Sequence, residues 1–153
     1  FPSKRHLLIQ VLSDSWDETG MLKSWLQKPP VSPGRALRNY LRELFAFHYA
    51  EWEASGYVRG SILGNISAEI GTADEPQIVK ELKRLSDQQR RAFRVLLIAG
   101  VKTGEFRVDD INTNADGLLA SIQGLLLLAK IRNDLSILPA SESLLMKVAG
   151  ISD

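Results

Sequence analysis

The most constraining feature of this sequence is a segment near its C-terminal end that is apolar on nearly every side of the helix it predicts. Its large aliphatic residues recur at helical spacing and also fill the positions between, as Leu118, Leu119, Ile122, Leu125, Leu126, Leu127, Leu128 and Ile131. A helix that is apolar all round has to be buried all round. A single small domain covers such a helix with difficulty, so the segment favours a second copy of the chain on the side left open.

A long helix predicted from about residue 76 to 100 carries a narrower apolar stripe. Its positions are spaced alternately by four and three residues, as Ile78, Leu82, Leu85, Gln89, Ala92, Leu96 and Ala99. This spacing is typical of a helix packed nearly parallel or antiparallel to a neighbour. We expect the two helices to hold a homodimer through Ile122, Leu125, Leu126, Gly117, Gly124, Leu85, Ala92 and Leu96. The alternative is a monomer in which the leucine-rich segment is simply the central helix.

Proline and glycine clusters divide the rest of the chain into helices. The boundaries predict helices from Ser3 to about residue 28, from about 33 to 54, from 58 to 70, from 76 to 100 with Asp74 as N-cap, from 114 to 132 with Asn114 or Thr113 as cap, and from 138 to 150. No stretch alternates as a strand would. The predicted fold class is therefore all-α, with about six to seven helices in an antiparallel bundle.

Composition bounds what such a bundle can do. The chain has 153 residues, 44% of them apolar, which is enough for one compact core. With 19 basic and 18 acidic residues the net charge is +1, so the chain has no general attraction for nucleic acid. An excess of basic residues occurs only between residues 80 and 94. These residues would form either a solvated helix face or a weak, salt-sensitive contact with DNA. The absence of cysteine excludes disulfides and thiolate chemistry, and the sequence predicts a soluble chain without a membrane partner.

No pattern of catalytic residues occurs in the sequence. It lacks a Gly-x-Ser-x-Gly motif and a phosphate-binding glycine loop. The two histidines, His6 and His48, fall on different predicted helices, so no metal site is expected. We predict no enzyme activity and no cofactor.

The aromatic residues concentrate before residue 60 and suggest a small-molecule pocket. Tryptophan and tyrosine bring polar tips that need hydrogen-bond partners, as ligand pockets do. The predicted ligand-binding residues are Trp16, Phe45, His48, Tyr49, Trp52 and Asn65. Each has an alternative role: the aromatic residues and His48 as core, and Asn65 as a partner of a backbone carbonyl. At least one adjacent pair on the second helix is expected to contact ligand.

The opening Phe1-Pro2-Ser3-Lys4, followed by Leu7, resembles the turn after the recognition helix in the TetR family of bacterial transcriptional repressors. Further matches follow in the family's order: Gly60 to Asn65 with Glu69, Gly104 to Arg107, and Ser121 to Gly124 running into the leucines. The segment after Gly60 departs from the common pattern in having Ser61 where many relatives carry cysteine. The resemblance implies a cytoplasmic regulator, with Lys4 at a position that often contacts a DNA phosphate.

On this basis we expect residues 1–153 to form a ligand-binding and dimerisation domain, with a helix-turn-helix domain missing upstream of residue 1. The predicted partners are a second copy, operator DNA through that upstream domain, and a small hydrophobic or amphipathic effector. Effector binding would shift the first helix and release DNA. The alternative is a helical enzyme or a stand-alone interaction bundle, in which case the opening residues match by coincidence.

Overall fold

The structure is a computed structural model that describes residues 3–70 and 75–151, and within these residues it contains helices and no strands. The helices are α1 (Lys4–Ser15), α2 (Met21–Gln27), α3 (Pro33–Ser55), α4 (Ile62–Glu69), α5 (Pro76–Thr103), α6 (Ile111–Arg132), α7 (Ile137–Ala140) and α8 (Glu142–Val148). The predicted all-α bundle is confirmed.

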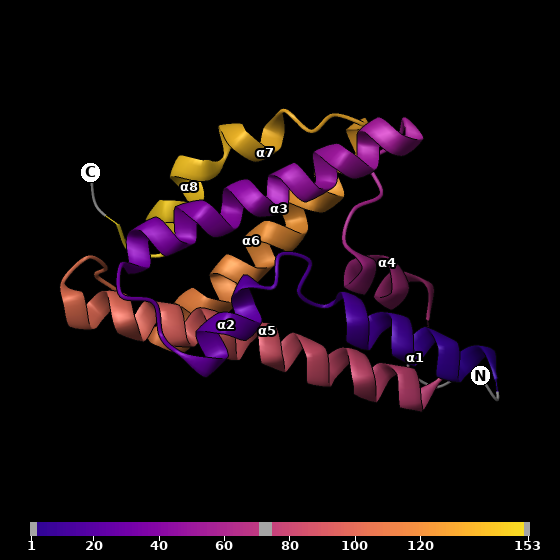
Figure 1. Ribbon diagram of the computed structural model, residues 1–153, viewed down its shortest axis with the longest axis horizontal. Coiled ribbons are helices and arrows are strands. Elements are labelled where there is room, and N and C mark those ends of the chain that lie inside the picture. Colours follow the sequence, from indigo (N-terminus) through magenta and orange to yellow (C-terminus); the bar gives the residue numbers. More distant parts are fainter. Residues whose placement is uncertain (1–2, 71–74, 152–153) are drawn as a thin grey trace.

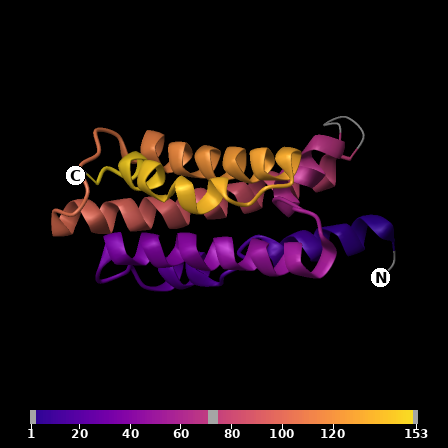
Figure 2. The same ribbon diagram turned by 90° about the horizontal axis from the view of Figure 1, so that it is seen from above.

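Helix α5 lies at the centre of the bundle, and α1, α2, α3, α4 and α6 pack against it (Figure 1). Seen from above, α6 and α8 lie on one side of α5, while α2 and α3 lie on the other (Figure 2). Helices α1 and α4 meet at the end of the bundle where the chain begins. The apolar stripe of α5 explains this arrangement, because Ile78, Leu85, Ala92 and Leu96 are all buried between the two sides.

The first predicted helix is divided in two. Helix α1 starts as expected, with the Ser3 hydroxyl accepting a hydrogen bond from the His6 amide, but it ends at Ser15. The Asp17 carboxylate then accepts a hydrogen bond from the Lys23 amide at 2.8 Å, which caps the first turn of α2. Gly20 supplies the left-handed turn between the helices, with φ of +75°. A buried cap and a glycine turn therefore end the helix where the apolar spacing alone predicts continuation.

Two further boundaries differ from expectation. Asp110, rather than Asn114 or Thr113, caps α6, because its carboxylate accepts from the amides of Asn112 and Thr113. Asn114 instead donates to the Val148 carbonyl and ties α6 to the last helix. The last predicted helix is divided into α7 and α8. Asp74, Phe1 and Pro2 lie outside the described residues.

The end of α5 is shaped by one close approach. Gly100 faces the ring of Phe106, which is buried, and a Cβ at Gly100 would overlap that ring. The chain turns back at Gly104, where φ is +79°, and the Phe106 amide donates to the Gly100 carbonyl at 3.0 Å. This packing folds the connector onto the helix end and sets the direction in which α6 starts.

Helix α6 is apolar all round, as predicted, but the chain buries only one of its faces. Ile122 and Leu126 lie in the core together with Leu85, Ala92 and Leu96 of α5, so these five are core residues of the single chain and cannot reach a partner. Leu125 is half-buried. The space beside Gly117 is filled by the side chain of Val148, which would lie 3.3 Å from a Cβ added at Gly117. Of the predicted interface residues, only Gly124 lies open, with no atom within 4 Å of an added Cβ.

The opposite face of α6 is exposed and apolar. We call it the α6 stripe, made of Gly124, Leu127, Leu128 and Ile131. Ile131 is 70% exposed and Leu127 is 56% exposed, which is unusual for aliphatic residues on a long helix. Leu144 of α8, which packs beside α6, is also exposed.

Candidate ligand-binding site

A pocket of a size that suits a small molecule lies between α4, α5 and α6. Its volume is about 460 Å³, within the range of small-molecule sites. Five of its eleven lining residues are leucine, isoleucine or valine, four are serine or glutamine, and Lys83 and Gly64 complete the wall. The lining residues are Leu63, Gly64, Ser67, Ile70, Val79, Leu82, Lys83, Ser86, Gln89, Leu119 and Gln123.

A smaller cavity of about 20 Å³ lies deeper, where the same three helices meet α3 and the end of α1. That volume suits one water molecule rather than a ligand. Leu63, Gln89 and Gln123 line both spaces and therefore form the boundary between them. Trp16, Glu18, Tyr40, Leu44 and Ser61 lie on the far wall.

Gln89 connects the pocket to the first helix. It occupies a position of the apolar stripe on α5 and is buried. Its side-chain amide donates a hydrogen bond to the backbone carbonyl of Trp16, the C-cap residue of α1, at 2.9 Å. The last carbonyls of a helix have no partner within the helix, so this bond satisfies a group that would otherwise be left unpaired.

The deeper cavity has an acidic and aromatic character. Burial raises the pKa of the Tyr40 hydroxyl far above its ordinary value, and the nearby carboxylates of Glu18 and Asp17 raise it further. Tyr40 therefore stays protonated and remains a hydrogen-bond donor. The buried His48 lies just beyond, with Nε2 3.6 Å from a Glu18 carboxylate oxygen and no hydrogen-bond partner for that nitrogen.

The structure places the predicted aromatic ligand residues differently from one another. Trp16 lines the deeper cavity but not the pocket. Phe45 and His48 are buried in the core. Tyr49 and Trp52 lie on the outer face of α3, where their exposed fractions are 37% and 40%. Among the described residues, none of these four lines the pocket or the deeper cavity; α3 contributes Tyr40 and Leu44 instead.

Asn65 has its hydrogen bonds satisfied within the chain. Its side-chain amide donates to the Arg59 carbonyl at 2.7 Å, and its oxygen accepts from Lys130 Nζ at 2.9 Å. It lines a hollow of about 350 Å³ between α4 and α6 that opens beside Gly124 and Leu127 of the α6 stripe. Gly64 and Gln123 separate this hollow from the pocket, since they line both.

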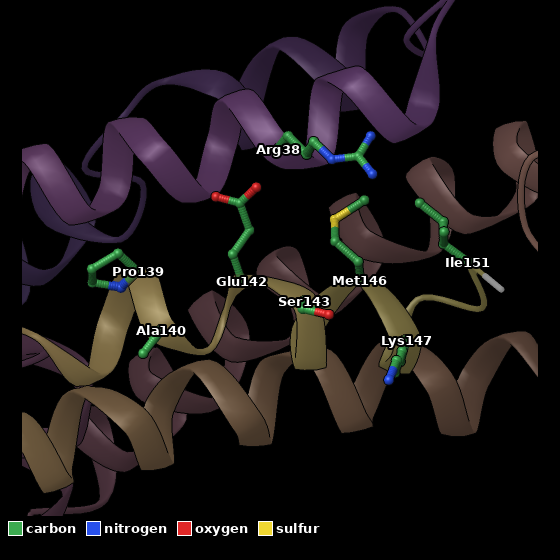
Figure 3. Close-up of a pocket in the computed structure, with 8 residues that line it drawn as sticks. All are labelled: Arg38, Pro139, Ala140, Glu142, Ser143, Met146, Lys147 and Ile151. Carbon is green, nitrogen blue, oxygen red and sulfur yellow. The ribbon is translucent and has the colours of Figure 1, made fainter. Parts of the chain in front are cut away.

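A further groove of about 440 Å³ lies between α3 and the helices α7 and α8 (Figure 3). Glu142 and Met146 point from α8 toward α3, and the Arg38 side chain lies across the opening. Glu142 pairs with Arg42 at 3.4 Å. Charged groups dominate this groove, and it is remote from α1, so it is less suited to an apolar effector than the pocket.

None of the eleven residues that line the pocket is among the predicted ligand residues, which include neither Lys83 nor Gln89. The basic run between residues 80 and 94 predicts a solvated position for Lys83, and the apolar stripe of α5 predicts a packing role for Gln89. The signal that could have identified Gln89 is a polar residue at a position whose neighbours in the stripe are apolar. Nothing in the sequence distinguishes Lys83 from Lys80, which is on the same helix but does not line the pocket.

Lys4, the residue expected to contact a DNA phosphate, is exposed in the first turn of α1.

No group of three or more histidine, aspartate or glutamate side chains is arranged to hold a metal ion in residues 3–70 and 75–151. Over the same ranges, no helix combines the length and the apolar character needed to cross a membrane.

Comparison with known proteins identifies the family. Residues 47–135 match the family model described as the QacR-like protein, C-terminal region. The match covers the motifs at Gly60, Gly104 and Ser121, whereas the opening residues lie outside it. No curated protein and no solved structure matches the chain. Because the family match spans more than half of the chain, the protein belongs to the QacR-like C-terminal regions, the C-terminal domains of TetR-type transcriptional regulators.

Proposed function

We propose that this chain is the effector-binding and dimerisation domain of a TetR-like transcriptional repressor. It would act by binding rather than by catalysis, and a helix-turn-helix domain would precede residue 1. Family membership supports a regulatory role. The observation that carries the mechanism is Gln89, which lines the pocket and also holds the C-cap of α1. As a regulator of transcription, the protein would act in the cytoplasm, where bacterial DNA lies.

The proposed switch uses this hydrogen bond. A ligand that accepts a hydrogen bond from the Gln89 side-chain amide would break the bond to Trp16 and so remove one support of α1. A ligand that displaces α4 from the pocket wall would remove another, because α4 contacts α1. At its other end α1 is tied to the start of α5 by the ion pair between Arg5 and Glu75, 2.8 Å apart. Since α1 would lead directly to the DNA-binding domain, a small movement of it in both subunits changes the separation of two recognition helices, which must match half-sites about 34 Å apart. Lys4, in the first turn of α1, would contact a phosphate.

The dimer would form through the α6 stripe and Leu144 of α8, rather than through the buried residues of α5. These two helices lie along one side of the molecule (Figure 2). A second copy related by a two-fold axis would cover the exposed leucines and isoleucine, and the open Gly124 allows close approach of a helix. A partner there would also cover the hollow lined by Asn65.

A thermal-shift screen of small apolar compounds tests the pocket. A ligand at about 100 times its dissociation constant stabilises the native state by roughly 2.7 kcal/mol, a readily measured shift. Ser86→Trp fills the pocket, whereas Asp87→Trp places the same ring on the next exposed position, outside the pocket. Compounds that stabilise the wild type and the Asp87→Trp variant but not the Ser86→Trp variant bind in the pocket. Hits that stabilise both variants equally would place the effector site elsewhere.

The proposed upstream domain is tested by the coding sequence before Phe1. A helix-turn-helix there supports the repressor, whereas a start codon immediately upstream would favour a stand-alone bundle. The 153-residue chain by itself should not bind operator DNA selectively, because its net charge is only +1. An electrophoretic mobility shift at physiological salt with the isolated chain would contradict this division of roles.

A further inference from the structure

The wall of the pocket between α4, α5 and α6 has an uneven distribution of charge. Its apolar surface comes from all three helices, through Leu63, Ile70, Val79, Leu82 and Leu119. Among its described lining residues, Lys83 is the charged one, and no aspartate or glutamate contributes. A ligand in this pocket therefore meets apolar side chains along its body and an ammonium group at the exposed edge, where Lys83 lies.

Lys83 lacks a counter-ion among the residues that the structure describes, unlike two other cations of α5. Arg84 is held by Glu81, and Arg90 is paired with Asp116 at 2.6 Å. Within the part of the chain that the structure describes, Lys83 has neither an ion pair nor a hydrogen bond. Its ammonium group is therefore available to pair with a charge on a ligand, and the Ser86 hydroxyl on the same wall can donate a further hydrogen bond.

The deeper cavity determines which way a charged ligand would lie. Glu18 lines that cavity, on the far side of Gln89. Its carboxylate repels a negative group placed deep in the site, while Lys83 attracts one at the mouth. An anionic group would therefore stay beside Lys83, with the apolar body pointing inward along α5.

We infer that the effector is an anionic amphiphile, an apolar molecule that carries one carboxylate, sulfonate or similar group paired with Lys83. This inference rests on the proposed function, because it names the chemical class of ligand for the same pocket. A cationic ligand would place its charge against an unpaired ammonium at the mouth, so the site selects against that class.

Two fluorescent probes with the same aromatic body test the inference. 8-Anilino-1-naphthalenesulfonate carries a sulfonate, and N-phenyl-1-naphthylamine lacks it. Titrations would use the 153-residue wild-type chain and four variants. Lys83→Met removes the charge, Lys83→Arg retains it, Lys80→Met removes a matched charge outside the pocket, and Ser86→Trp fills the pocket. Circular dichroism confirms that each variant is folded.

The inference predicts that Lys83→Met weakens binding of the sulfonate probe by about fivefold, as expected for one partly screened charge pair, and changes that of the neutral probe by less than about twofold. Lys83→Arg and Lys80→Met should leave both affinities near wild type. If Lys83→Met affects the two probes equally, or affects neither, while Ser86→Trp abolishes their binding, the pocket stands and the anionic class is wrong. If Ser86→Trp changes neither affinity, the pocket itself is wrong, and both proposals fail.

Discussion

The side-chain amide of Gln89 donates a hydrogen bond to the backbone carbonyl of Trp16, 73 residues away along the chain, at a distance of 2.9 Å. This bond is buried and joins the central helix of the bundle to the end of the first helix. Because Gln89 also lines the pocket, the bond lies between the proposed effector and the helix that would lead to DNA.

Replacing Gln89 by leucine should destabilise the fold. The substitution keeps a side chain of similar size but leaves the Trp16 carbonyl without its partner, which costs about 1–3 kcal/mol. Urea unfolding monitored by circular dichroism measures the loss. Gln88→Leu is the matched control, since Gln88 is the neighbouring residue and lies outside the buried stripe. An equal loss in the two variants would show that the hydrogen bond has no special role.

The double substitution Leu127→Glu with Ile131→Glu should dissociate the proposed dimer and leave the helices intact. Both residues are exposed in the single chain, so the charges stay solvated in the monomer but are buried without partners in the dimer, at a cost of several kcal/mol. Sedimentation velocity measures the association.

Two comparisons accompany that experiment. Phe47→Glu, at an exposed apolar residue of α3, should leave the association unchanged. Leu126→Glu should unfold the chain, because Leu126 is only 2% exposed within the monomer. A wild-type chain that sediments as a monomer at micromolar concentration would rule out the proposed interface.

Asp110 should make the stability of α6 depend on pH. Hydrogen bonds from the Thr113 side chain, the Thr113 amide and the Asn112 amide lower the pKa of its carboxyl below the ordinary value of 3.8. Since the native pKa is the lower one, the stabilisation is complete above pH 3.8 and is lost as the pH falls through the native pKa. Asp110→Ala should therefore be less stable than wild type at pH 7, and the difference should shrink toward pH 2. Urea midpoints at the two pH values measure this, and a constant difference would contradict the assignment.

Gly100→Ala should destabilise the domain although alanine favours helices. The added methyl group overlaps the ring of Phe106, and overpacking of this kind costs about 1–3 kcal/mol or more. Thermal unfolding measures the loss. In the double variant with Phe106→Leu the overlap is relieved, so the two losses should not add. Strict additivity would mean that the connector moves away without cost.

The sequence predicted those features that depend on neighbours along the chain. The apolar periodicity identified α5 and α6 and the all-α class, because 3.6-residue spacing is a local property of a helix. The start of the first helix at Ser3 was likewise predicted, and it depends on a local contact, since the Ser3 hydroxyl accepts from an amide three residues away. The motifs at Gly60, Gly104 and Ser121 indicated the family that the match then showed.

Only the tertiary structure decided which apolar residues face the core. Ile122 and Leu127 are both aliphatic residues of α6, yet α5 covers one and leaves the other exposed. The same holds for the ligand site: Lys83 and Lys80 are identical in type and lie one turn apart, and only the packing of α4 against α5 places Lys83 on the pocket wall. The physical reason is that burial and pairing are set by segments distant in sequence, which the local pattern of residues does not specify.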